Sequence, residues 1–259
     1  MKFKKYVALL IVLVLMASLL STTAVAVESN EVRAINTLPR KPQVASLVER
    51  TEDTEVYRIP VHSQTRGLYY LDLELTGDKT AHTVTAKLKN SFALGSSTID
   101  VTLKLYSIRY STVLRGTAHD DDLDLWQSIS VTHSNVSSTA KYYAVVTGTA
   151  NGEDIYYSTY SIPFNSRGEK YPTHISSPVT GESLPYDFSV TLSAKPSSQW
   201  VPWNPTIKKE YAKYLGEDLS GYDVHHIVPR RYGGTNNYSN LIPLKKGDHT
   251  TVTNWWKYY

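Results

Sequence analysis

The sequence predicts a mainly β protein, in which an N-terminal antiparallel β-sandwich is followed by a small α+β domain. Apolar and polar residues alternate repeatedly between about residues 55 and 192, and a period of two is typical of half-buried strands. The same stretch is rich in Thr, Ser, Val and Tyr and contains no convincing helix, which favours a sandwich of about seven or more strands. The final segment has a different layout, with strand, loop, strand and helix signals in succession.

Residues 1–26 have the three parts of a secretory signal peptide. Lysines at positions 2, 4 and 5 precede an apolar run over 7–20, and Ala24-Val25-Ala26 provides a small-x-small cleavage site. An uncleaved membrane anchor is the alternative, but this run of 14 residues is shorter than the roughly 20 that span a bilayer. We therefore expect a secreted, extracellular protein with no stable membrane association after cleavage.

The amino-acid composition excludes some kinds of site and favours a charged partner. The 259 residues include no cysteine, which excludes disulfides, thiolate metal ligands and a cysteine nucleophile. The formal charge of +3 comes from the three lysines of residues 1–26, so the remainder is neutral. Residues 197–259 nevertheless hold eight basic and five acidic residues. This excess suits a polyanionic partner, although chance distribution is the alternative.

The segment 27–53 is polar, has no sustained period and is predicted to be a linker or propeptide. Residues 54–196 then form the predicted sandwich. Alternation marks strands around Leu71–Leu75, Val84–Leu88 and Ile99–Leu105, and Asn151-Gly152 predicts a tight turn between two later strands. A last strand is expected over Phe188–Leu192.

Other polar groups in this region admit ordinary interpretations. The histidines at positions 62, 82, 119, 133 and 174 are scattered, which is typical of surface or structural histidines. Asp120-Asp121-Asp122 with Asp124 could bind calcium, but a solvated acidic loop is the commoner outcome. The many tyrosines could stack on sugars, although packing within the sheets is the commoner explanation.

A second domain, 197–259, is predicted to begin after Pro196. Asn204 can cap a helix that has Pro205 at its first position. Ile207, Tyr211 and Leu215 would share one face of this helix, and Gly216 would end it.

The last forty or so residues read GYDVHHIVPRRYGGTNNYSNLIPLKKGDHTTVTNWWKYY. His225 and His226 end a short strand, and Gly233-Gly234 forms a loop that can turn sharply. Asn240 precedes a second apolar run, and His249 follows at the start of a predicted helix. Histidines placed in this way can converge on one metal ion.

This stretch resembles the ββα-metal motif of HNH endonucleases, most closely the double-histidine branch of bacteriocin nucleases and secreted bacterial toxins. The resemblance implies that His225 and His249 are metal ligands and that His226 is the general base. It implies that Asn240 holds the strands together and orients the base through its amide. Adjacent strand residues point to opposite faces, which allows the paired histidines to take separate roles.

The resembling nucleases place one more ligand four residues after the last histidine, where this chain has Thr253 beside Asn254. Neither is a strong ligand. Two imidazoles leave several positions for water and phosphate, so Mg²⁺ or Mn²⁺ is favoured as the one divalent ion, with Zn²⁺ and Ni²⁺ as alternatives.

Four cations flank the motif, Arg230, Arg231, Lys245 and Lys246. They could grip phosphates beside the scissile one, or they could be ordinary surface charge. Trp255 and Trp256 are expected to pack in the core rather than stack on bases.

The predicted function is a secreted, metal-dependent endonuclease that hydrolyses the phosphodiester bonds of DNA, or alternatively RNA, with little sequence specificity. It would serve as a toxin, with an immunity protein as partner, or as an extracellular nuclease. The competing hypothesis is a cell-surface adhesion protein whose sandwich binds a ligand and whose nuclease-like domain is inactive. Plasmid cleavage with and without a chelator separates the two.

Overall fold

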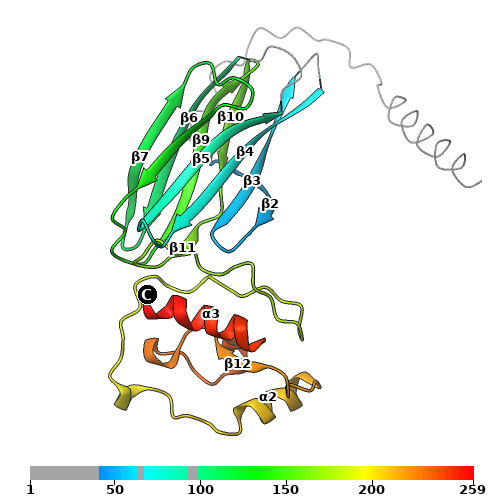
Figure 1. The fold of residues 1–259 in the computed structure, drawn as a ribbon, viewed down its shortest axis with the longest axis vertical. Helices are drawn as coiled ribbons and strands as arrows, with labels where there is room; N and C mark the ends of the chain where they lie inside the picture. The colour runs from blue at the N-terminus through cyan, green and yellow to red at the C-terminus, as the bar shows by residue number, and fades with distance from the viewer. Residues whose placement is uncertain (1–40, 64–66, 93–97) are drawn as a thin grey trace, which may run out of the picture. The chain divides into compact units, whose positions relative to one another are not determined.

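The computed structural model describes residues 41–259 except 64–66 and 93–97. The predicted signal peptide, 1–26, and most of the predicted linker lie outside the described residues. The predicted β-sandwich is present as two packed sheets, whose strands lie between Gln43 and Phe164 (Figure 1). The C-terminal residues add two helices and a two-stranded sheet, so the mainly β class with a small α+β region is confirmed.

One sheet has the strand order β2-β3-β4-β5-β8, and all its neighbours are antiparallel. Its strands are β2 (Ser46–Arg50), β3 (Thr54–Ser63), β4 (Gly67–Asp78), β5 (Thr83–Phe92) and β8 (Ser128–His133).

The other sheet has the order β1-β10-β9-β6-β7, with β11 also paired to β9. Its pairs are antiparallel apart from the parallel pair of β1 and β10. Its strands are β1 (Gln43–Val44), β6 (Ile99–Ile108), β7 (Thr112–Asp120), β9 (Ala140–Ala150), β10 (Glu153–Ser158) and β11 (Ile162–Phe164).

The alternation in the sequence places one set of side chains between the sheets. In β6, burial alternates along the strand, with Ile99, Val101 and Leu103 buried and Asp100 exposed. Leucines at positions 71, 73 and 75 of β4 do the same from the opposite sheet and join the same apolar core. The Asn151-Gly152 turn is confirmed, because both residues have positive φ, 53° and 82°, as the favoured two-residue hairpin turn requires.

The structure corrects two expectations about this half of the chain. Part of the predicted linker is strand, because β2 pairs with β3 and β1 pairs with β10. Both are short edge strands with mostly exposed side chains, so they carry little hydrophobic pattern. The strand expected over Phe188–Leu192 is absent. Phe188 and Leu192 instead pack, without strand pairing, on the C-terminal core.

A buried carboxylate ties the sandwich to the chain that follows it. Glu55 Oε1 lies 3.0 Å from Arg50 Nε and 3.8 Å from Lys170 Nζ. It also accepts a hydrogen bond of 2.6 Å from Thr173 Oγ1, while Glu55 Oε2 accepts one of 2.6 Å from Tyr57. The side chains of Glu55 and Lys170 are fully buried, so this cluster is stable only while its partners stay together.

The C-terminal region contains α2 (Ile207–Leu215), β12 (Asp223–His226), β13 (Leu241–Leu244) and α3 (Lys246–Lys257). The 3₁₀ turns η1 (Ser197–Gln199), η2 (Arg230–Tyr232) and η3 (Tyr238–Asn240) lie in the connections. Strands β12 and β13 form an antiparallel pair that places His225 opposite Ile242. The helix α3 contacts β12 (Figure 1).

Helix α2 starts two residues later than its capping signal suggested and ends as predicted. Asn204 Oδ1 accepts a 3.0 Å hydrogen bond from the backbone N–H of Thr206, which precedes the first helical residue. Gly216 has φ 72° in the left-handed region and donates its N–H to Ala212. The Tyr211 hydroxyl donates a 2.8 Å hydrogen bond to the carbonyl of Leu241, so the helix packs on the histidine motif.

Within the residues that the structure describes, no helix is long and apolar enough to cross a bilayer.

Candidate functional site

The three histidines of the C-terminal motif come together. His225 and His226 lie at the end of β12, and His249 is in the first turn of α3. The rings of His225 and His249 have centroids 5.0 Å apart and planes at 81°. All three side chains line one cavity of about 410 Å³, which is within the range of about 300–1,000 Å³ that is usual for ligand sites.

His225 is held as a neutral imidazole. It is 5% exposed, and burial, together with the nearby His249 and His226, lowers its pKa to about 3. Its Nε2 is buried and has no hydrogen-bond partner among the described residues. A buried nitrogen left unpaired costs about 1–3 kcal/mol, and a metal ion would satisfy it.

The donor set therefore fits one divalent ion held by His225 and His249. Neutral imidazole is the form that binds a metal. Among the described residues, no group of three or more His, Cys, Asp or Glu side chains comes together in a geometry that could hold a metal. Thr253, one turn after His249 on α3, also lines the cavity, and it occupies the place where the resembling nucleases have their further ligand.

His226 is half-buried and has a different partner. Its Nε2 lies 2.9 Å from Asn236 Oδ1, and Asn236 Nδ2 donates a 3.2 Å hydrogen bond to the carbonyl of Pro202. Since that carbonyl can only accept, the amide must turn its oxygen toward His226. Nε2 of His226 then carries the proton, and Nδ1 keeps the free lone pair that a general base needs.

Of the two roles expected for Asn240, the structure shows the one in which its side chain holds backbone segments together. Its Oδ1 accepts a 2.9 Å hydrogen bond from the backbone N–H of Val228, and its Nδ2 donates to the carbonyls of Val228 and Thr235 at 3.1 and 2.9 Å. These bonds hold the loop between β12 and β13 closed. The amide that orients His226 belongs instead to Asn236, which the sequence analysis did not single out. The Asn-Asn pair after the glycines was the available signal.

The glycines allow this loop to close. Gly233 has φ 90°, in the left-handed region. At Gly234, a Cβ would lie 1.6 Å from the carbonyl oxygen of Val228 and 2.9 Å from Asn240 Nδ2. Only glycine fits at position 234 while Asn240 makes its hydrogen bonds.

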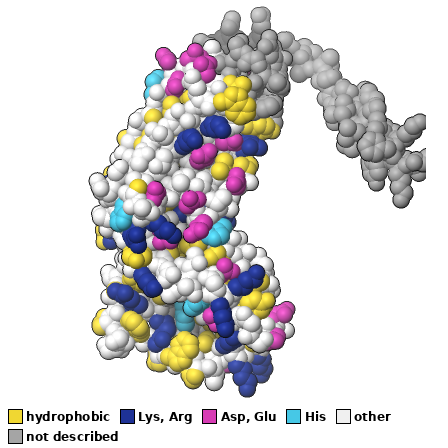
Figure 2. Space-filling view, in the orientation of Figure 1, with side chains coloured by type: hydrophobic (Ala, Val, Ile, Leu, Met, Phe, Trp, Pro, Cys, Tyr) yellow, Lys and Arg dark blue, Asp and Glu magenta, His cyan; other side chains and the backbone are white. Residues whose placement is uncertain are grey.

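The four expected phosphate contacts divide into two pairs. Arg230 and Arg231 line the cavity, whereas Lys245 and Lys246 are exposed at the start of α3 and do not line it. Lys257, from the last turn of α3, lines it instead. On the face drawn in Figure 2, Lys and Arg side chains are spread over the C-terminal region with a histidine among them.

Trp255 and Trp256 are buried, as expected. They belong to an apolar cluster that includes Tyr171 and Phe188, and Trp255 Nε1 donates a 2.8 Å hydrogen bond to the carbonyl of Glu169. Tyr171 and Trp255 meet edge to face with ring centroids 4.8 Å apart. The helix that carries His249 is therefore anchored by its last turns.

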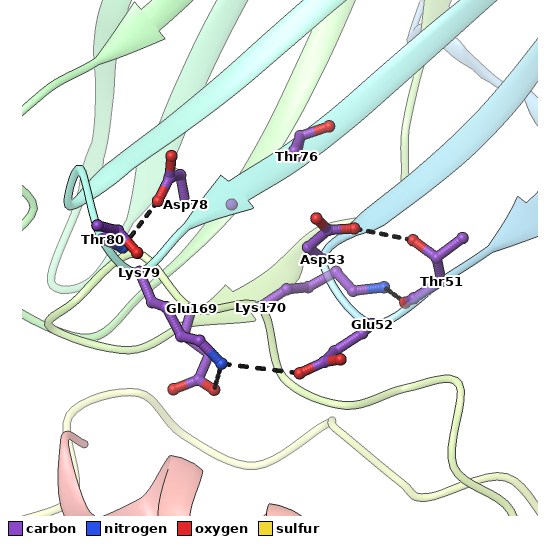
Figure 3. A pocket seen from close by; sticks show the side chains of 10 residues that line it. Thr51, Glu52, Asp53, Thr76, Asp78, Lys79, Thr80, Glu169 and Lys170 are labelled. Atoms are coloured by element: carbon purple, nitrogen blue, oxygen red, sulfur yellow. Dashed lines mark hydrogen bonds and ion pairs between the residues drawn. The ribbon is translucent and has the colours of Figure 1, made fainter.

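A second cavity, of about 550 Å³, lies at one end of the sandwich (Figure 3). Lys79 is placed between Glu52 and Glu169, at 3.7 and 3.6 Å, and buried Lys170 donates to the carbonyl of Thr51. Four carboxylates and two lysines line this cavity, with no histidine among the lining residues. Its acidic balance opposes a phosphate ligand, so the histidine cavity is the better candidate site.

Residues 215–254 match the family model described as HNH endonuclease. No curated protein and no solved structure matched the chain. The C-terminal region is thus an HNH endonuclease domain, which indicates a nuclease-type hydrolase and a nucleic acid substrate. HNH endonucleases generally use a divalent metal ion, in agreement with the donor set around His225.

Proposed function

We propose that this protein is a metal-dependent endonuclease that hydrolyses phosphodiester bonds in nucleic acid with little sequence specificity. The observation that carries the proposal is the meeting of His225 and His249, 5.0 Å apart between ring centroids, beside His226 in one cavity. The unpaired Nε2 of His225 supports a metal site there.

His225 and His249 would hold the ion. A divalent ion bound there would polarise the scissile phosphate and stabilise the leaving oxygen. Two imidazole ligands leave room for water and phosphate oxygens, so we favour Mg²⁺ or Mn²⁺, with Zn²⁺ and Ni²⁺ as alternatives.

His226 would act as the general base. Its Nδ1 accepts a proton from the attacking water while Asn236 holds the imidazole by Nε2. A new P–O bond forms as the bond to the leaving oxygen breaks. Arg230, Arg231 and Lys257 line the cavity and would attract the phosphates beside the scissile one.

Four alanine variants separate these roles. His226→Ala should lower plasmid cleavage about 10²–10⁴-fold, the usual contribution of a general base, while calorimetry with Mn²⁺ still detects binding. His225→Ala and His249→Ala should lose both cleavage and Mn²⁺ binding. Asn240→Ala should lower cleavage less than His226→Ala does.

His119→Ala is the matched control, because His119 is an exposed histidine of β7 and does not line the cavity. Each protein is incubated with plasmid and Mg²⁺ or Mn²⁺, with and without EDTA. An unaltered protein that never cuts plasmid or RNA would favour the adhesion protein with an inactive domain. Cleavage by all the histidine variants at the rate of the unaltered protein would place the active site elsewhere.

We also propose export. The tripartite organisation of residues 1–26 supports a mature chain that begins near Val27, outside the cytoplasm and without a stable membrane attachment. It would act as a toxin with an immunity protein or as an extracellular nuclease. Sequencing the N-terminus of the exported protein tests this; a chain that still begins at Met1, or that stays with membranes, contradicts it.

A further inference from the structure

Trp203 exposes a large apolar ring beside the histidines. It is 63% exposed, and it lines the same cavity as His225, His226 and His249. The two tryptophans of α3, by contrast, are buried in the core. An exposed tryptophan in a cavity that holds the proposed catalytic histidine offers a flat surface on which a ligand can stack.

The ring is held in place by a cation. The Arg230 guanidinium carbon lies 5.9 Å from the ring centroids of both Trp200 and Trp203. The Nε of Arg230 donates a 2.6 Å hydrogen bond to the carbonyl of Val201. Since Arg230 lies only four positions after His226, the last residue of β12, this contact fixes Trp203 relative to the paired histidines.

A second tether joins the same segment to His226. The carbonyl of Pro202 accepts a hydrogen bond from Asn236 Nδ2, and Asn236 Oδ1 meets His226. The two carbonyls that immediately precede Trp203 are therefore both bound to residues of the site. These bonds fix the backbone that leads into Trp203, and the Arg230 guanidinium contacts the ring itself.

The charge around the ring fits a polyanion. Among the residues that line the cavity are Arg230, Arg231 and Lys257, and none of the lining residues is Asp or Glu. The cavity near Lys79 shows the contrast, because its lysines are outnumbered by carboxylates. A ligand that combines a flat ring with phosphates matches both features of the histidine cavity.

We propose that Trp203 is a stacking surface for an unpaired base next to the scissile phosphate, so that the site prefers single-stranded nucleic acid. This inference rests on the proposed nuclease function. In a duplex, each base face is covered by its neighbours, whereas an unpaired base can lie on an aromatic ring. Trp203 is thus a positioning residue for substrate, held by Arg230.

Binding measured in EDTA tests the proposal without cleavage. Fluorescence anisotropy is recorded with labelled oligothymidylate, oligouridylate and a DNA duplex of equal length. The unaltered protein should bind the single strands more tightly than the duplex. Trp203→Ala should weaken single-strand binding about tenfold, within the usual range for loss of one stacked base, and should leave duplex binding nearly unchanged.

Two further variants control for structural effects. Trp203→Phe keeps a ring and should recover most of the single-strand affinity. Trp126→Ala removes an equally exposed tryptophan of the sandwich, 64% exposed, and should behave as the unaltered protein. Unchanged single-strand binding by Trp203→Ala would overturn the proposal, as would an equal loss for single strands and duplex.

The outcomes also separate the two proposals. Single-strand binding that depends on Trp203, in a protein that cuts no nucleic acid with any of the four ions, would support the stacking surface and refute the nuclease. Cleavage of plasmid, with single-strand binding that does not respond to Trp203→Ala, would support the nuclease and refute the stacking surface.

Discussion

His225 and His226 are neighbours in the chain but have different surroundings. His225 is buried, with its pKa lowered to about 3 and its Nε2 unpaired, whereas His226 is half-buried and bound to Asn236. Strand geometry turns successive side chains to opposite sides, so the His225 imidazole meets His249 of α3 and the His226 imidazole meets Asn236 of the loop. This difference supports a ligand role for the first and a proton-transfer role for the second.

Alanine variants of the two loop asparagines should differ in their effects on stability and on cleavage. Asn240→Ala removes three hydrogen bonds to backbone and should cost about 1–3 kcal/mol of stability. Asn236→Ala should leave the thermal midpoint close to that of the unaltered protein while cleavage falls, because the His226 ring loses its orientation. Thermal melts paired with plasmid assays measure both effects. Equal loss of stability in the two variants would show that Asn236 is a structural residue only.

Gly234 should not tolerate a side chain. A Cβ would lie 1.6 Å from the Val228 carbonyl oxygen, so Gly234→Ala must displace the loop. We expect this to lower the free energy of unfolding by about 3 kcal/mol, the upper end of the usual cost of overpacking. Gly247→Ala is the matched control, since a Cβ there meets nothing within 4 Å and alanine favours the helix. Urea denaturation of both variants tests this. Similar midpoints would show that the loop accommodates a side chain at position 234.

At the scale of elements, α3 serves the site and the core at once. His249, Thr253 and Trp256 recur at helical spacing and line the cavity, while Trp255 packs against Tyr171 and donates to Glu169. The first turn of the helix thus presents the histidine, and the last turns anchor it.

Loss of that anchor should destabilise the C-terminal region. Trp255→Ala removes a fully buried ring and should cost about 3–5 kcal/mol, the usual range for such truncations. Trp255→Phe should lose less, because part of the aromatic packing remains. Urea denaturation followed by circular dichroism gives the values, with Trp126→Ala as the exposed control. A Trp255→Ala variant as stable as this control would mean that the helix is held by other contacts.

At the scale of the whole chain, the contacts of residues 165–190 link the sandwich to α3. Lys170 and Thr173 complete the buried cluster around Glu55, whereas Tyr171 and Phe188 belong to the apolar cluster of Trp255. Different residues of this segment thus pack in the buried cluster around Glu55 and in the apolar cluster around Trp255. The predicted boundary near Pro196 stays a prediction.

Shortened chains test that boundary. A chain that ends at Pro196 keeps Lys170 and Thr173, so its sandwich should melt cooperatively, and EDTA should not shift the midpoint. A chain that ends at Phe164 removes Lys170 and Thr173 from Glu55 but keeps Arg50 and Tyr57. It should be less stable by about 1.5–3 kcal/mol, the usual contribution of a hydrogen bond to a charged group. Calorimetry of the two chains measures the difference. An unfolded chain to Pro196 would place the boundary elsewhere.

The sequence alone was enough to predict the mainly β class, the Asn151-Gly152 hairpin, the end of a helix at Gly216 and the grouping of three histidines. These features depend on side-chain period, left-handed backbone positions and residue spacing, which are local properties of the chain. The edge strand β2 escaped prediction because an exposed edge needs no hydrophobic pattern. The strand expected at Phe188–Leu192 is absent because Phe188 and Leu192 pack against the buried residues of α3 instead.

Only the tertiary structure decided which groups complete the site. Asn236 rather than Asn240 reaches His226, and Lys257 joins the arginines in the cavity in place of Lys245 and Lys246. Trp203 meets Arg230 across 27 positions of the sequence. Such contacts depend on how loops and helices pack, because hydrogen bonds and stacking act over a few ångströms in space while the partners lie far apart along the chain.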